Sequence, residues 1–473
     1  MALTKTAPDL RENKLRSMPV GRLLFTMALP LIMSMLVQAF YNVVDSWYVS
    51  QIPEHAESAV TALSLAFPIQ HLQIGFSTGI AVGVNALLSK SLGQGRQDKA
   101  NQAAGNGIFL MFLSIALFMV FGFFGAEPYF AMQSNVEATV NGGASYVAIC
   151  TIFGAGIFVE IMGERLLQAS GRTIFTLFTQ GTGAVLNIVL DPLFIFGSES
   201  LGIAPMGIAG AAVATVIGQW VAAILAVIFN LTCNKDVQFS LKAIMPRWEI
   251  CKKILTVGIP SIIMMAIGSV MNFSMNQIFL GFRALGETAA AVFGIYFKLQ
   301  SFFLMPVLGI NNASVSIVAY NYGARQPKRV TGNLKYALCF AMVIMLIGLT
   351  AFQLFPHVFM GFFSSGESSE LFMQLGIKAL RIVSIHFPLA AVGIILSASF
   401  QALGTGIYST IISLCRQLVV LVPAAWLLSL TGQVDHVWWA FPLAELASTT
   451  MAILFFLRIY RKKIKPLSLA DCG

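Results

Sequence analysis

The stretch LLFTMALPLIMSMLVQAFYNVV, residues 23–44, contains no charged residue and decides the fold class. A helix rises 1.5 Å per residue, so this stretch matches the ~30 Å hydrocarbon core of a bilayer. Residues 108–125 are likewise uncharged. Only 10% of the 473 residues are charged. Soluble domains carry about 25%, so a soluble multidomain enzyme is excluded. We therefore predict an all-α integral membrane protein.

Twelve apolar stretches of this kind follow one another along the chain. The shorter alternating segments typical of barrel strands are not seen. We predict twelve transmembrane helices, at residues 23–48, 58–84, 102–125, 141–164, 173–197, 206–231, 253–281, 288–313, 333–355, 375–400, 406–430 and 437–458.

Charged residues predict the orientation of these spans. Most of the 29 Lys and Arg lie in the terminal segments and in the loops on one side, whereas the opposite loops carry mainly acids. The positive-inside rule then places both termini in the cytoplasm, for a multi-pass protein of the inner (plasma) membrane. Because the basic residues are scattered through short loops, the net charge of +9 does not predict nucleic-acid binding. The six Cys form no close pairs, so we predict no metal site, disulfide framework or cofactor.

The two halves of the sequence resemble each other at a nearly fixed offset. Pro30 aligns with Pro260 and Gly93 with Gly323, both 230 residues apart, and Gly171 aligns with Gly404, 233 residues apart. Six spans per half give both halves the same orientation, related by a pseudo-two-fold axis along the membrane normal, as in alternating-access carriers. The predicted parts are a cytoplasmic segment (1–22), an N-lobe (23–231), an inter-lobe loop (232–252), a C-lobe (253–458) and a basic tail (459–473).

Two acids lie inside predicted spans of the N-lobe, where a charge costs ~2.5–3.5 kcal/mol on insertion scales. Asp45 shares a helix face with Gln38 and Asn42, and Asp191 shares a face with Asn187. Both carboxylates are predicted at similar depth. They form a hard-oxygen site for a proton or a sodium ion, the expected coupling ion. The alternative is that Asp45 caps an exposed helix end and contacts water.

Two prolines are expected to bend the helices that carry these acids. Pro192 directly follows Asp191, and Pro30 lies in the first span. Proline cannot donate a backbone hydrogen bond, so it leaves a carbonyl free to face a cavity.

The C-lobe has no matching acid pair, because Asp45 aligns with Met275 and Asp191 with Ala424. Lys298 and His386 are the candidates for a second polar cluster there. Glu164 and Arg165 are expected to form an interfacial pair near the inner surface.

Several segments together resemble the multidrug and toxic-compound extrusion (MATE) family, closest to its DinF/MepA-like branch. The resemblance covers nearly the whole chain and rests on these segments: Leu29-Pro30-Leu31-Ile32, Leu92-Gly93-Gln94-Gly95-Arg96, Gln168-Ala169-Ser170-Gly171, and LNIVLDPLFIFG at residues 186–197.

The resemblance implies V-shaped lobes and export of organic cations or amphipathic drugs, driven by proton or sodium entry. It implies a cation site at Asp45, Asn187 and Asp191, with Thr215 supplying a hydroxyl. Gln38, Tyr41 and Tyr146 match polar or aromatic positions that line the lobe. The acids that another branch uses in the C-lobe are missing from the span at 253–281. Coupling in the C-lobe is therefore not expected.

Two other functions stay open at this point. A flippase of lipid-linked sugars from the wider superfamily would need a cationic cleft, for which Lys298, Arg381 and Arg416 are the candidates. An intramembrane aspartyl enzyme would use Asp45 and Asp191 as its dyad, but a GxGD-type motif is absent. The expected partners are small amphipathic or cationic substrates and the lipid bilayer, and a monomer is expected.

Overall fold

The computed structural model of the protein describes residues 14–50, 52, 56–134, 136–282, 285–362 and 369–470. The side chains of 42–43, 46–47, 49–50, 56–60, 241, 369 and 468–470 lie outside this description. The first half contains α1 (Lys14–Ser17), α2 (Val20–Ser50), α3 (Ala56–Gly93), α4 (Gln97–Phe124), α5 (Ala126–Gln133), α6 (Glu137–Ile152), α7 (Ala155–Ala169), α8 (Ile174–Ile195), η1 (Glu199–Leu201), α9 (Ile208–Thr232) and α10 (Leu241–Ile244).

The second half continues with α11 (Trp248–Leu280), α12 (Gly286–Gly323), α13 (Pro327–Leu354), α14 (Pro356–Gly361), α15 (Ser369–Ser384), α16 (Phe387–Ala402), α17 (Ile407–Leu414), η2 (Cys415–Leu421), α18 (Val422–Ser429), α19 (Val434–Val437), α20 (Ala440–Ile459), η3 (Tyr460–Ile464) and α21 (Lys465–Ala470). In the described residues, ten helical stretches are long and apolar enough to cross a membrane, and two bent pairs bring the number to twelve. The predicted twelve spans are confirmed.

The bent pairs correct the prediction that spans 141–164 and 375–400 are single continuous helices. α6 meets α7 at 46°, and α15 meets α16 at 49°. In the second pair, Pro388 cannot donate to the Ser384 carbonyl, so the helix breaks before it. In the first, a side chain intervenes, because Gln73 Nε2 donates to the Cys150 carbonyl at 3.1 Å. α7 and α16 begin 232 residues apart, so the break recurs in both repeats.

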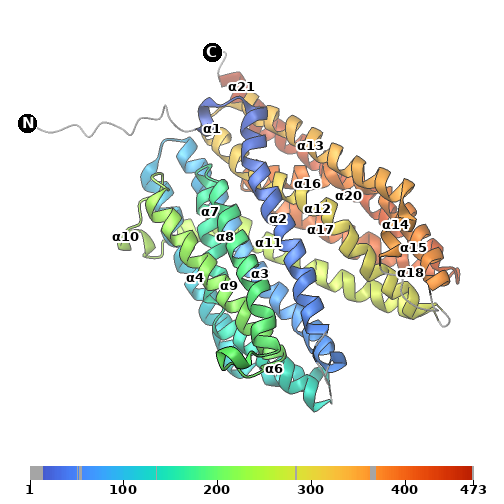
Figure 1. Ribbon diagram of the computed structural model, residues 1–473. Coiled ribbons are helices and arrows are strands. Elements are labelled where there is room, and N and C mark those ends of the chain that lie inside the picture. Colours follow the sequence, from blue (N-terminus) through green and yellow to red (C-terminus); the bar gives the residue numbers. More distant parts are fainter. Residues whose placement is uncertain are drawn as a thin grey trace, which may run out of the picture.

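The helices form two lobes whose ends meet at one side and diverge at the other (Figure 1). α2–α9 make the N-lobe and α11–α20 make the C-lobe. The end that carries α1 and α21 is called the basic end here, after its Lys- and Arg-rich segments. α3 and α12 reach this end at Gly93 and Gly323, beyond the predicted bounds 84 and 313. These extensions let the lobes meet.

A seam of glycines joins the lobes at and near the basic end. A Cβ atom on Gly93 would overlap the Tyr320 carbonyl oxygen, and a Cβ on Gly323 would overlap the Lys90 carbonyl oxygen. These contacts exchange under the repeat, since 320 − 90 and 323 − 93 both equal 230. Deeper in the seam Gly79 packs on Ile262 of α11, and its equivalent Gly309 packs on Ile32 of α2. The structure therefore realises the predicted pseudo-two-fold symmetry through backbone contact, as small residues permit between membrane helices.

The helix α1 seals this seam from outside. Leu15 is fully buried. Arg329 Nη2, on the C-lobe, donates to the carbonyls of Leu15 (2.9 Å) and Met18 (2.8 Å). Lys14 packs beside Gly171 of the N-lobe, and burial, together with the neighbouring Arg172, lowers the pKa of its ammonium group. α1 thus contacts both lobes where they meet.

We expect Arg329→Ala to release α1. A hydrogen bond to a charged group contributes ~1.5 kcal/mol or more, so amides of residues 14–18 should exchange hydrogen about tenfold faster. Hydrogen-exchange mass spectrometry measures this directly. The matched control is Lys328→Ala, the exposed neighbour. Equal exchange rates in both variants would contradict the role of Arg329.

Candidate functional site

Three helices of the N-lobe bring the predicted acids together. Asp45 comes from α2, Asn187 and Asp191 from α8, and Thr215 from α9. Asn187 and Asp191 lie one turn apart on the buried face of α8, so the lobe interior receives both. Asp191 is completely buried, and Asp45 is 9% exposed. Asp45 therefore does not cap an exposed helix end.

Asn187 connects Asp191 to the rest of the site. The hydrogen-bond network orients the Asn187 amide so that its nitrogen donates to Asp191 Oδ2 at 2.8 Å. Its oxygen then accepts from the backbone N and the Oγ1 of Thr215, both at 3.1 Å. Thr215 is in turn hydrogen-bonded to Tyr41. A continuous polar chain runs from Tyr41 through Thr215 and Asn187 to Asp191.

Asp45 completes the acid pair without joining that chain. Its charge interacts with those of Asp191 and Tyr41. Its Oδ1 atom is buried and has no hydrogen-bond partner among the described residues. A buried carboxylate oxygen without a donor is costly. A proton or a hard cation at this oxygen would remove the cost, so the residues present fit the expected coupling ion. Histidine, cysteine and acid groups suited to a bound metal are not found in the described part of the chain.

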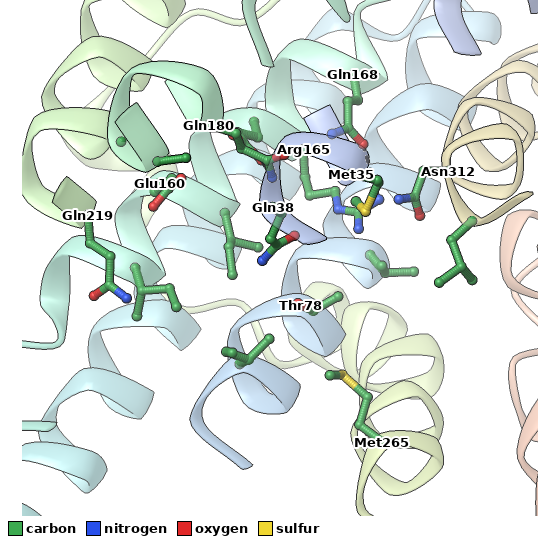
Figure 2. A pocket seen from close by; sticks show the side chains of 18 of the residues that line it. Met35, Gln38, Thr78, Glu160, Arg165, Gln168, Gln180, Gln219, Met265 and Asn312 are labelled. Atoms are coloured by element: carbon green, nitrogen blue, oxygen red, sulfur yellow. Dashed lines mark hydrogen bonds between the residues drawn. The ribbon is translucent and has the colours of Figure 1, made fainter. Parts of the chain in front are cut away.

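A central cavity of about 410 Å³ lies beside the acid pair, between the lobes. Its N-lobe wall comes from α2, α3, α7, α8 and α9, and its C-lobe wall from α11, α12 and α16. Gln38 and Tyr41 line it as predicted, and so do Asn187 and Thr215. Figure 2 shows Gln38 in this pocket, between groups from both lobes. The polar chain described above therefore begins at the cavity and ends at the buried Asp191.

Sequence reasoning missed the polar wall that α7 gives to this cavity. Glu160, Glu164 and Arg165 all line it, so the expected interfacial position of Glu164 and Arg165 is wrong. Glu164 is buried and accepts from Thr179 Oγ1 (2.6 Å) and Gln180 Nε2 (2.9 Å). The helices extend further toward the basic end than predicted, so these residues lie inside the lobe. The four-residue spacing of the two Glu was the available signal.

Two further cavity predictions have different outcomes. Tyr146 lies outside the cavity, in a separate apolar cluster with Phe130 and Val147, where its hydroxyl accepts from Gln70 Nε2 at 2.8 Å. The Asn42 side chain lies outside the described part of the chain, although its backbone belongs to α2.

Both predicted prolines lie inside intact helices, Pro30 in α2 and Pro192 in α8. Each lacks an N–H, so the carbonyls of Thr26 and Ile188 lose their usual helical donor. Bending at these positions stays a prediction.

The structure does not bring Lys298 and His386 into one cluster. Lys298 lies on the exposed face of α12. His386 is buried at the α15–α16 break, where its charge interacts with those of Glu445 and Arg416. Arg416 Nη1 and Glu445 Oε2 form an ion pair at 3.3 Å, and Arg416 lies on the π-helical turn η2. Sequence position identified the spans but not the helix faces.

Two six-helix lobes that meet at one end and enclose a polar cavity define the chain as a membrane transporter, not an enzyme. The MatE family model matches residues 30–193 and 260–427, one segment in each lobe. The chain belongs to this family. The two matched segments begin 230 residues apart, the offset of the repeat.

The chain is similar to proteins of different printed function. It is 26% identical to an FAD transporter of Shewanella oneidensis, over 92% of this chain and 94% of that protein. It is 23% identical to the multidrug export protein MepA of Staphylococcus aureus, over 93% and 94% respectively. A solved outward-facing conformation of a multidrug resistance MATE family transporter has the same fold, with a TM-score of 0.88, 24% identity, and coverage of 97% of this chain and 99% of that one.

Proposed function

We propose that the protein is a cation-coupled antiporter that exports small amphipathic or cationic molecules by alternating access. The observation that carries this proposal is the double role of Asn187 and Thr215. Both line the central cavity, and both belong to the hydrogen-bonded chain that ends at Asp191. A change of proton or sodium occupancy at the acid pair therefore acts directly on the cavity wall.

The proposed cycle uses the two lobes as rocking bodies. Substrate enters the cavity from the cytoplasm or inner leaflet, and a proton or sodium ion then binds at Asp45 and Asp191. α2 and α8 change their bend at Pro30 and Pro192, the cavity contracts, and substrate leaves outward. Exchange requires that the cation and the substrate prefer different conformations. The protein would reside in the inner membrane, with the basic end and both termini in the cytoplasm.

The cargo named for the relatives supports export but leaves the substrate open, since one is a multidrug exporter and the other an FAD transporter. A lipid-linked sugar is less well supported. Lys298 and Arg381 are exposed, and Arg416 is paired with Glu445. Along the described cavity wall, Arg165 is accompanied by two acids, Glu160 and Glu164.

Efflux of a cationic dye tests the proposal. Vesicles that contain the purified protein are loaded with ethidium, and proton and sodium gradients are imposed separately. We expect one of the two gradients, directed inward with respect to dye exit, to accelerate ethidium efflux above that of protein-free vesicles. Efflux that responds to neither gradient would contradict cation coupling.

A further inference from the structure

Three carboxamides of the C-lobe face the central cavity without a partner in the described part of the chain. Asn311 and Asn312 lie on α12 and Gln401 lies on α16, and each is only 8% exposed. Among the residues that the structure describes, none of the three side chains makes a hydrogen bond, and Asn311 Oδ1 is closed off completely. Buried amides that find no partner are unfavourable. The arrangement therefore requires a molecule in the cavity that donates and accepts hydrogen bonds.

The N-lobe adds two more carboxamides of the same kind. Gln38 of α2 and Gln219 of α9 line the cavity and have no hydrogen-bond partner within the described ranges. Figure 2 shows Gln38, Gln219 and Asn312 around the pocket, contributed by both lobes. This set differs from Gln180, whose amide is already engaged by Ser34 and Glu164. Five amides that lack a partner among the described residues thus surround one space.

The chemistry of these groups indicates what they bind. A carboxamide presents one acceptor oxygen and two N–H donors in a plane. This pattern pairs with the edge of a heteroaromatic ring, as Asn and Gln do with adenine. Met35, Met264 and Met265 line the same cavity and offer polarisable thioethers to aromatic rings. A hydrocarbon cation would contact the methionines but would leave the amides unpaired.

We propose that the cavity prefers a flat heteroaromatic substrate whose ring edge carries imide or amide groups, the chemical class of flavins and pterins. Asn312 and Gln401 bind the ring edge, and the methionines pack on the ring. The volume of about 410 Å³ falls in the range of small-molecule sites. This inference rests on the proposed function, because it assigns the substrate class of the same cavity.

Equilibrium binding to the full-length purified protein tests the proposal. Riboflavin is the heteroaromatic probe, and tetraphenylphosphonium is the hydrocarbon cation. The variants are Asn312→Leu, Gln401→Met and the double variant, which keep side-chain size but remove the hydrogen bonds. Gln433→Met is the control, since Gln433 is exposed and does not line the cavity. Thermal unfolding identifies any variant that fails to fold, in which case the single variants carry the comparison.

We expect riboflavin to bind the wild type and the double variant to bind it about tenfold more weakly or worse, because a site built for hydrogen bonds discriminates strongly. Binding of tetraphenylphosphonium should not weaken in any variant. Binding of tetraphenylphosphonium without riboflavin would overturn the inference while leaving the proposed antiporter intact. Equal losses for both ligands would overturn it too. If neither ligand binds and ethidium efflux is also absent, the proposed function itself fails.

Discussion

Replacing Asp191 with asparagine is expected to reduce gradient-driven ethidium efflux to the level of vesicles without protein. An amide has nearly the shape of the carboxylate but carries neither a titratable proton nor a negative charge. Asp191 is completely buried and receives the Asn187 amide at 2.8 Å, a contact that the oxygen of the substituted amide can still accept. The fold should therefore persist while cation binding is lost.

The control for this experiment is Asp98→Asn. Asp98 is exposed in the first turn of α4, away from the central cavity, and should be neutral in efflux. Asp191→Glu keeps the charge and should restore part of the activity, which a purely structural role of Asp191 would not predict. Full ethidium efflux and full drug resistance in Asp191→Asn would show that coupling takes place elsewhere.

Replacing a seam glycine with alanine is expected to separate the basic ends of the lobes. The added Cβ of Gly93→Ala meets the backbone oxygen of Tyr320, and that of Gly323→Ala meets the backbone oxygen of Lys90. Backbone atoms cannot rotate away, so the lobes must move apart or the helices must shift. Overpacking of this kind costs ~1–3 kcal/mol.

The measurement combines thermal unfolding with ethidium efflux. Both seam variants should melt earlier and transport poorly, because a leaky seam cannot hold the basic end closed. Gly294→Ala is the matched control on α12, where an added Cβ meets open space. Alanine is a better helix former than glycine, so this control should be neutral or slightly stabilised. Behaviour of Gly93→Ala equal to that of Gly294→Ala would contradict the glycine seam.

The spans and the repeat could be predicted from sequence because both depend on local composition. Uncharged stretches fix the membrane helices, and the spacing of Asn187 and Asp191 fixes their shared face on α8. The exact symmetry of Gly93 and Gly323 also followed from a constant offset, since identical backbones pack in equivalent ways.

The rest depended on packing between distant helices. Tyr146 and Lys298 were in the expected spans, but tertiary contacts determine which helix face meets a cavity. Glu164 was expected near the inner surface, because the helical extensions of α3 and α12 carry no strong apolar signal. The cavity-lining amides of Asn312 and Gln401 come from separate helices, so only the folded chain brings them together.

The central claim is that cation entry is tied to substrate exit through Asp45 and Asp191. The most direct measurement follows ion movement in proteoliposomes when ethidium is added to one side, with an internal pH dye for protons and a radioactive tracer for sodium. The wild type and Asp98→Asn should move one of these ions opposite to ethidium, and Asp191→Asn should move neither in response. Ion movement in Asp191→Asn equal to that of the wild type would contradict the account.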